Sequence, residues 1–198
     1  MPITVNELVK EAGLDPKSLK KVKWGTPVST QKEGVYIVSL SETPDANNSL
    51  AEIPISRNIL KEWIDKVDGF KLGGKLTHDI KTIKHELSKF WLFDENILYI
   101  GKASNLHERI GAFYRHKTGK KSPHSGGHWI KILKNVNELY VYYIECDNCE
   151  YYEAKTLCIF FEQVSQKIKE QLKGTGIILP FANIEIRKEH KLGHMTKK

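Results

Sequence analysis

The sequence predicts an α+β fold in which helices pack on a small, three-stranded sheet. Three segments rich in β-branched and aromatic residues are expected to form the strands, at 34–40, 97–101 and 138–146. Between them lie segments whose apolar residues recur every three or four positions, which is typical of amphipathic helices. With 198 residues, 40% of them hydrophobic and 28% charged, the chain is expected to form one soluble domain with a hydrophobic core.

The chain is expected to begin with a helical arm over residues 1–32. A first helix is predicted from about residue 5 to 12, because its apolar residues share one face and Gly13 follows it. A second, short helix is expected to have Asp15 as its N-cap and Pro16 at its first position, where a proline loses no hydrogen bond. Its lysines are predicted to form a basic face: Lys17, Lys20, Lys21 and Lys23.

A pair of helices is predicted between the first two strands. Residues 41–54 have the composition of an exposed loop, after which Ser56 is expected to cap one amphipathic helix. A glycine-rich break at 69–74 follows, and Thr77 is expected to cap a second helix that reaches Trp91. The spacing therefore indicates a helical hairpin inserted between two strands.

The second half of the chain alternates helices and strands. Asn105 and Glu108 have the spacing of a capping box at the start of a helix. A basic, glycine-rich loop is expected at 117–128 and a short helix at 129–133. One long helix is predicted from about residue 148 to residue 173, because its apolar residues repeat every three or four positions until Gly174.

The charge and the cysteine content narrow the function classes. A net charge of +7 favours a polyanion as partner, although the excess is modest. The chain has no run of eighteen apolar residues and no secretion signal at its start, so a cytoplasmic protein that does not contact membranes is expected. The three cysteines, Cys146, Cys149 and Cys158, are too few for a secreted disulfide framework and are expected to be free thiols.

Several short motifs together resemble the GIY-YIG nuclease superfamily, whose members cut DNA with the help of a metal ion. Gly34-Val35-Tyr36 stands on the first predicted strand and Tyr99-Ile100-Gly101 on the second. Arg109 follows eight residues after the second tripeptide, Glu153 lies early in the long helix, and Pro180-x-x-Asn183 comes later. The sequence departs from the family pattern in Val35, which replaces isoleucine, and in the 62 residues between Tyr36 and Tyr99.

The resemblance implies a mainly antiparallel sheet and one nuclease domain over residues 1–198. Within it we expect a catalytic core (33–40 and 96–185), a helical insertion (41–95), the N-terminal helical arm (1–32) and a basic tail (186–198). It also implies these catalytic residues: Tyr36, Tyr99, Lys102, Arg109, His116, Glu153 and Asn183.

Phosphodiester hydrolysis explains why such residues are useful. Glu153 is expected to bind Mg²⁺ or Mn²⁺, since hard cations prefer oxygen ligands; the alternative is a solvated glutamate near a helix N-terminus. Arg109 is expected to hold a phosphate through forked hydrogen bonds, or else to form an ion pair with Glu108 or Asp147. Lys102 would add positive charge near the phosphate.

The remaining catalytic assignments are less specific. Tyr36 is expected to position or deprotonate water, which at neutral pH requires nearby positive charge, and Tyr99 to orient the phosphate. Asn183 is expected to order the site by hydrogen bonding or to be a turn residue. His116 is one of several histidines that could serve; a zinc site of His116, His124 and His128 lacks the paired spacing of structural zinc sites.

Cations interleaved with aromatic residues suggest contact with a nucleic-acid backbone. The residues expected to bind nucleic acid are Arg115, Lys117, Lys120, Lys121, His124 and His128. The leading hypothesis is a metal-dependent DNA endonuclease, and a homodimer is one arrangement that would suit it. The alternatives are a nucleic-acid-binding module that has lost cleavage and an unrelated small-molecule enzyme or interaction protein.

Overall fold

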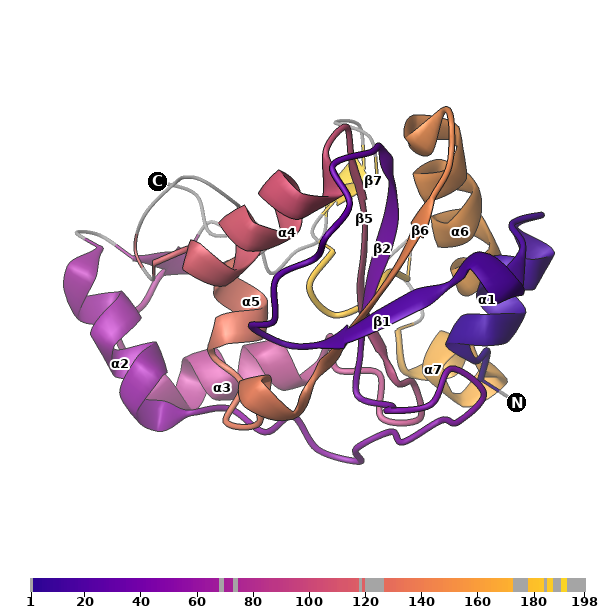
Figure 1. Cartoon of the computed structure of the whole chain (residues 1–198). Coiled ribbons are helices and arrows are strands. Elements are labelled where there is room, and N and C mark those ends of the chain that lie inside the picture. Colours follow the sequence, from indigo (N-terminus) through magenta and orange to yellow (C-terminus); the bar gives the residue numbers. More distant parts are fainter. Residues whose placement is uncertain are drawn as a thin grey trace.

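The computed structural model describes residues 2–67, 70–72, 75–117, 119, 127–172, 178–183, 185–186 and 190–191. Its centre is a four-stranded antiparallel sheet with the order β1-β6-β2-β5 (Figure 1). The strands are β1 (Lys20–Lys23), β2 (Gly34–Ser39), β5 (Ile97–Ala103) and β6 (Tyr140–Glu145). The predicted α+β class is confirmed, and the three predicted strands correspond to β2, β5 and β6.

The fourth strand, β1, is a correction to the predicted basic helix. Only Pro16–Ser18 forms a helical turn, with the Asp15 side chain accepting a hydrogen bond from the Lys17 backbone N–H. The chain then extends, and β1 pairs with β6 with Val22 opposite Val141. Cross-strand pairing thus outweighs the weak helical pattern, and the lysines lie along an edge strand, where charge discourages pairing with another chain.

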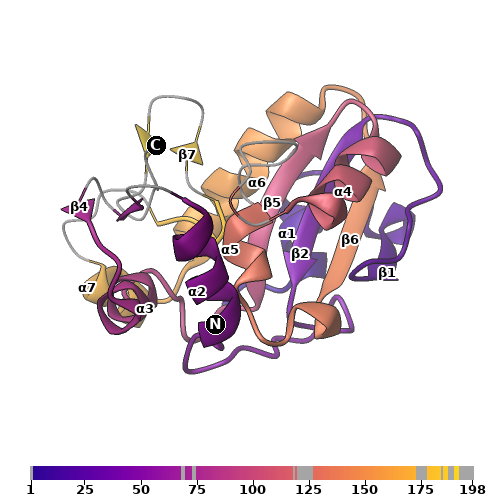
Figure 2. The same cartoon turned by 90° about the vertical axis from the view of Figure 1, so that its left-hand side faces the viewer.

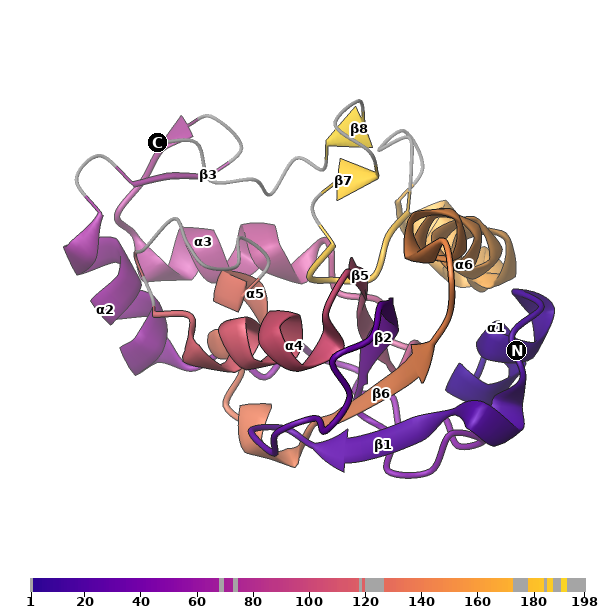
Figure 3. The same ribbon diagram turned by 45° about the horizontal axis from the view of Figure 1, so that its top comes forward.

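The helices cover both faces of the sheet (Figure 3). One face packs against α1 (Val5–Glu11), α6 (Cys149–Gln163) and α7 (Gln166–Gln171). The other packs against α4 (Leu106–Arg115), α5 (Gly127–Lys131) and the inserted helices. Because β2 lies inside the sheet, its alternate residues are buried on both sides, with Val35 and Ile37 on the α6 face and Tyr36 and Val38 on the α4 face.

The insertion shares its core with the sheet and is not a separate unit (Figure 2). It contains α2 (Arg57–Lys66), the strands β3 (Lys71–Leu72) and β4 (Lys75–Leu76), and α3 (Ile80–Ser88). Ser56 caps α2 as predicted, whereas α3 is capped by Asp79 and not by Thr77. Trp63 and Phe70 are buried in the same hydrophobic cluster as Tyr36.

The predicted long helix is interrupted. α6 ends at Gln163 because Val164 takes an extended conformation, and the Ser165 side chain then caps α7 by accepting a hydrogen bond from the Ile168 backbone N–H. Val164 and Ile168 both remain in the apolar cluster beneath α6, so the break preserves the burial that the spacing predicted. In the tail, β7 (Glu185–Ile186) pairs with β8 (His190–Lys191). No helix in the described ranges has both the length and the apolar character needed to cross a membrane.

Candidate active site

The register of β2 against β5 brings the two motif tyrosines together. Tyr36 pairs with Gly101 and Val38 with Tyr99, so the two tyrosines are diagonal neighbours on one face of the sheet. Their ring centroids lie 5.6 Å apart, and Phe113 of α4 packs edge-on against both rings. The two tripeptides, 62 residues apart in sequence, therefore form one cluster.

The motif glycines leave room that a side chain would fill. A Cβ atom on Gly101 would lie 2.5 Å from Tyr99 Cε1 and 2.9 Å from Tyr36 Cζ. A Cβ atom on Gly34 would lie 2.2 Å from the Ile144 carbonyl oxygen of the neighbouring strand. Both positions therefore require glycine. At Gly101 two phenol rings pack against the backbone, and at Gly34 the backbone of the neighbouring strand does.

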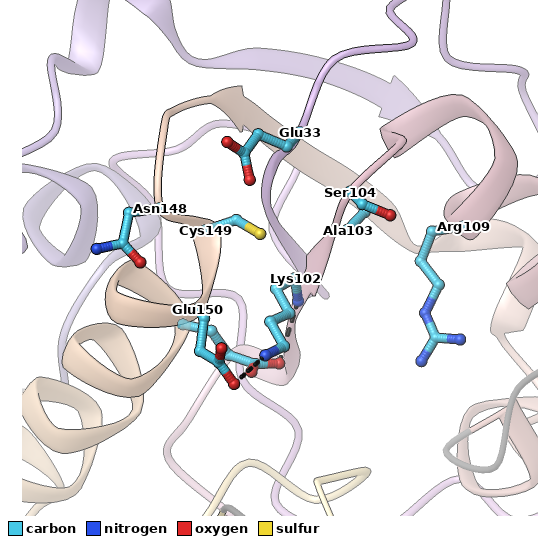
Figure 4. Close-up of a pocket in the computed structure, with 9 residues that line it drawn as sticks. Glu33, Lys102, Ala103, Ser104, Arg109, Asn148, Cys149 and Glu150 are labelled. Carbon is cyan, nitrogen blue, oxygen red and sulfur yellow. Dashed lines mark hydrogen bonds and ion pairs between the residues drawn. The ribbon is translucent and has the colours of Figure 1, made fainter.

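A pocket of about 570 Å³ opens beside this cluster, where the C-terminal end of β5 meets the start of α6 (Figure 4). Lys102, Ala103 and Ser104 line it from β5 and the residue after it, and Arg109 lines it from α4. The remaining lining residues are Glu33, Asn148, Cys149, Glu150 and Glu153. Three chain segments thus contribute charged side chains to one pocket.

Two carboxylates of α6 are joined to Lys102. The Lys102 backbone N–H donates to Glu153 Oε1 at 3.1 Å, and the Lys102 ammonium forms an ion pair with Glu150 Oε1 at 2.6 Å. Burial raises the pKa of Glu153, and the positive charges of Lys102 and Arg109 oppose that rise. Glu153 is therefore a half-buried carboxyl group at the pocket wall and not a solvated surface glutamate.

Burial is also the largest influence on the pKa of the two phenols, Tyr36 and Tyr99. The Tyr36 side chain has no exposed surface, and burial raises its pKa well above the usual value for tyrosine, while the nearby Arg109 guanidinium lowers it. Burial raises the pKa of Tyr99 as well, with Arg109 again acting in the opposite direction. Both phenols are consequently neutral at pH 7, and Arg109 is the cation that acts on both.

Asn183 lies at the outer edge of β5. Its side-chain oxygen accepts from the Ile100 backbone N–H at 2.8 Å, and its side-chain nitrogen donates to the Ile100 carbonyl at 2.7 Å. The Ala182 backbone N–H also donates to the Leu98 carbonyl. The predicted ordering contact is thus made to the backbone of the Tyr99-Ile100-Gly101 tripeptide, in place of a further strand.

The histidines form a different cluster. His116 ends α4, is buried, and its Nε2 lies 3.2 Å from His128 Nε2. The His128 ring stacks on Trp63 of the insertion with centroids 4.6 Å apart. Burial, together with His128 and Lys131, lowers the pKa of His116 to about 4. Neither His116 nor His128 is among the residues that line the 570 Å³ pocket.

The other predicted nucleic-acid contacts follow α4. Arg115 and Lys117 are exposed at its C-terminal end, with Arg115 3.9 Å from Glu108. Lys120, Lys121 and His124 lie outside the described residues. Two N-terminal lysines, Lys20 and Lys32, share one carboxylate, because both form ion pairs with Glu145. The net charge of +7 is unchanged by these pairs, since it already counts Glu145.

The residues at the pocket fit a magnesium ion held by one carboxylate. Within the described ranges no three His, Cys, Asp or Glu side chains are arranged so that they could together hold a metal ion. Mg²⁺ does not need such a cage, since it usually keeps several waters and binds one or two carboxylates. Glu153 supplies such a carboxylate in a pocket that is open to solvent.

Sequence reasoning missed five polar lining residues: Glu33, Ser104, Asn148, Cys149 and Glu150. Glu33 directly precedes the first tripeptide, and Glu150 lies one helical turn before Glu153, so proximity to the motifs was the available indication. Cys149 is buried at the start of α6 and its thiol forms a hydrogen bond with Glu33; burial raises its pKa.

Comparison with known proteins adds no assignment: no family model matches the chain, and neither a curated protein nor a solved structure is detectably similar to it.

Proposed function

We propose that this protein is a metal-dependent DNA endonuclease with a GIY-YIG-type site. One observation carries the proposal: Arg109 and Glu153 line one open pocket, and Arg109 also acts electrostatically on the buried pair Tyr36 and Tyr99 beside it. These are the residue types that phosphodiester hydrolysis uses, since it needs cations at the phosphoryl oxygens, a carboxylate for a divalent cation and a group that orients water.

In this proposal the phosphate binds between α4 and β5. Arg109 donates forked hydrogen bonds to the phosphoryl oxygens, and the Ser104 hydroxyl and the Lys102 ammonium supply further donors. Lys102 is paired with Glu150 in the free protein, so substrate binding exchanges a carboxylate partner for a phosphate. The exchange costs little because both side chains are partly exposed.

Glu153 would hold the divalent cation, and its carboxylate is fixed by the Lys102 backbone N–H. When bound, the cation supplies positive charge that stabilises the transition state and lowers the pKa of nearby groups. Arg109 already acts on Tyr36 in the same direction. Tyr36 is fully buried and neutral in the free protein, so it would have to reach the pocket and lose its own proton, which both positive charges favour, before it could accept a proton from the attacking water. Tyr99 would orient the phosphate.

Plasmid nicking with Mg²⁺ or Mn²⁺ tests the proposal. We expect wild-type protein to convert supercoiled plasmid to nicked plasmid, and Glu153→Gln to lose at least 100-fold in rate, on the scale of one lost electrostatic contact. Glu170→Gln is the matched control, because Glu170 is an exposed glutamate on the neighbouring helix α7. It should cut at the wild-type rate.

Two results separate the proposal from its alternatives. Salt-dependent DNA binding without cutting under any divalent ion would replace it with a nucleic-acid-binding module that lacks catalysis. Cutting that persists in Glu153→Gln would remove the assignment of the metal ligand, and absence of both binding and cutting would remove nucleic acid as the substrate.

A further inference from the structure

A second pocket, of about 530 Å³, lies at the inserted helices and is separate from the candidate active site. Its walls are helix α3, the segment that follows α3, the loop before α2 and the last residue of α7 (Figure 2). It shares no lining residue with the 570 Å³ pocket among the described residues. Its volume is within the range of pockets that hold small molecules. We call it the α3 pocket.

Helix α3 supplies cations to the α3 pocket. Lys81, Lys84 and His85 line it, and because they are spaced by three and four positions along α3 they share one face of the helix. All three side chains are exposed, and neither lysine forms an ion pair with another residue in the described part of the chain. The described lining contains one carboxylate, that of Glu52. The lysines therefore give the α3 pocket a positive charge that favours an anionic ligand.

The segment after α3 supplies aromatic rings to the same pocket. Trp91 and Phe93 line it together with Ile53. The Trp91 indole N–H donates to the Leu50 carbonyl at 2.7 Å, and the Phe181 ring packs edge-on against Trp91 with centroids 5.2 Å apart. These contacts hold the Trp91 ring in place before any ligand binds, so the α3 pocket has a preformed apolar surface beside its cations.

We propose that the α3 pocket binds a nucleotide, with the phosphate at Lys81 and Lys84 and the base against Phe93 and Trp91. A nucleotide joins the two properties that the lining favours. Its phosphate attracts lysine ammonium groups, and its planar base packs on aromatic side chains. An inorganic anion would use only the cations, and an uncharged ring would use only the apolar surface.

The same chemistry is found in a free nucleotide and in a nucleotide of a single strand. The Glu52 carboxylate and the Gln171 amide complete the lining with groups that accept and donate hydrogen bonds, as sugar hydroxyls and base edges require. The site itself does not depend on the proposed nuclease function. If that function holds as well, a strand bound here would make a second contact with the substrate.

Calorimetric titration of the full chain, without divalent ions, tests the proposal with three probes: deoxyadenosine monophosphate (dAMP), deoxyadenosine and inorganic phosphate. We expect dAMP to saturate the protein below about 1 mM, and each of the other two to bind at least about tenfold more weakly. Lys81→Gln with Lys84→Gln should weaken dAMP binding at least about tenfold, on the scale of lost hydrogen bonds to a charged group. The matched control, Lys10→Gln with Lys61→Gln, removes two exposed lysines outside the pocket and should bind as wild type does.

Backbone amide NMR locates the bound nucleotide. We expect dAMP to shift the amides of Lys84 and Phe93 and to leave those of Lys102 and Glu153 unchanged. The proposal is overturned if dAMP does not bind, if it shifts only Lys102 and Glu153, if phosphate alone binds as tightly, or if the Lys81 and Lys84 double variant keeps wild-type affinity.

A short single-stranded oligo(dA) with a terminal phosphate separates the two sources of nucleotide. Shifts at Lys84 and Phe93 with both the oligonucleotide and dAMP would assign the α3 pocket to a strand, and shifts with dAMP alone would assign it to a free nucleotide. Because no divalent ion and no cleavage enter these measurements, dAMP binding without nuclease activity would remove the proposed function and keep this site. Nuclease activity without dAMP binding would do the reverse.

Discussion

Gly101 lies directly beneath two phenol rings, and the absence of its side chain positions both. Tyr99 and Tyr36 occupy the space where a Cβ atom would project from β5. Arg109 acts on both phenols from α4, so a small shift of the rings changes their distance from the guanidinium as well. The geometry of the candidate site therefore depends on a residue that contributes no functional group.

Gly101→Ala should displace the tyrosines and reduce cleavage more than tenfold. It should also lower the free energy of unfolding by about 2 kcal/mol, because the methyl group overpacks the cluster. Urea unfolding and plasmid nicking measure the two effects. Gly111→Ala is the control: a Cβ atom there meets the flexible end of Arg115, and alanine in the middle of α4 should be neutral or stabilising. Equal effects of both variants would contradict this role of Gly101.

Glu95 is a buried carboxyl group outside the candidate site. Its side chain is 1% exposed, and neither carboxyl oxygen has a hydrogen-bond partner among the described residues. Burial, with the nearby charge of Asp94, raises the pKa of Glu95 to about 8. The folded protein thus keeps this proton at neutral pH, whereas the unfolded chain loses it near pH 4.5.

The free energy of unfolding should accordingly fall as pH rises from about 4.5 to about 8, by ~5 kcal/mol from this group. Between these values the folded state binds more protons than the unfolded state, so rising pH favours unfolding. Glu95→Gln removes the titration and should leave a flatter profile above pH 5. Urea unfolding of both proteins at pH 6 and pH 9 measures the difference, and identical slopes would contradict the assignment.

At the scale of elements, residues 178–183 act as a substitute strand. Asn183 makes with its side chain the two hydrogen bonds that a paired strand would make to the Ile100 backbone, and Ala182 adds a third bond to Leu98. Asn183 is 6% exposed, so these bonds are shielded from water. Residues 178–183 therefore bind the free edge of β5, the strand that carries Tyr99 and Lys102.

Asn183→Ala should lower the free energy of unfolding by about 2 kcal/mol, because the Ile100 N–H and C=O lose their partners. Amide hydrogen exchange at Ile100 should become faster, while exchange at Tyr142 in β6 should change only with global stability. Hydrogen-exchange NMR separates the two amides. Unchanged protection of Ile100 would show that the segment does not order β5.

At the scale of the whole molecule, the insertion and the sheet form one core. Trp63 of α2 contacts Trp129 of α5 at 5.2 Å between centroids, and Trp129 packs near Phe181, which in turn contacts Trp91. This chain of aromatic rings joins α2, α5, the segment beside β5 and the end of the insertion. Unfolding of the insertion alone would therefore expose aromatic rings both of the insertion and of the part of the protein that remains folded.

The described insertion and sheet should therefore unfold in one transition. Trp63→Ala should lower the free energy of unfolding by about 4 kcal/mol, through loss of a fully buried ring. Hydrogen exchange by mass spectrometry in low urea should give equal opening free energies for α3 and β6. Lys61→Ala, an exposed substitution on the same helix, should be neutral. An insertion that opens first would contradict a shared core.

Local sequence patterns predicted helices and strands correctly where one feature, such as a run of β-branched residues or a capping serine, was strong. The β-branched runs identified β2, β5 and β6, and Ser56 was the correct cap of α2. β1 was missed because four residues of mostly lysine carry little strand propensity, and their conformation depends on pairing with β6. The break between α6 and α7 was missed because Val164 continues the apolar spacing while its backbone leaves the helix.

The sequence alone determined the α+β class, the three main strands and the identity of the motif residues, because propensity and spacing are local properties. The tertiary structure decided which of those residues meet. It placed Tyr36 beside Tyr99, turned Asn183 onto the Ile100 backbone, and put His116 against His128 away from the pocket. Burial decided their chemistry, because solvent exclusion sets the pKa of Tyr36 and Glu153, and no single segment of sequence contains that information.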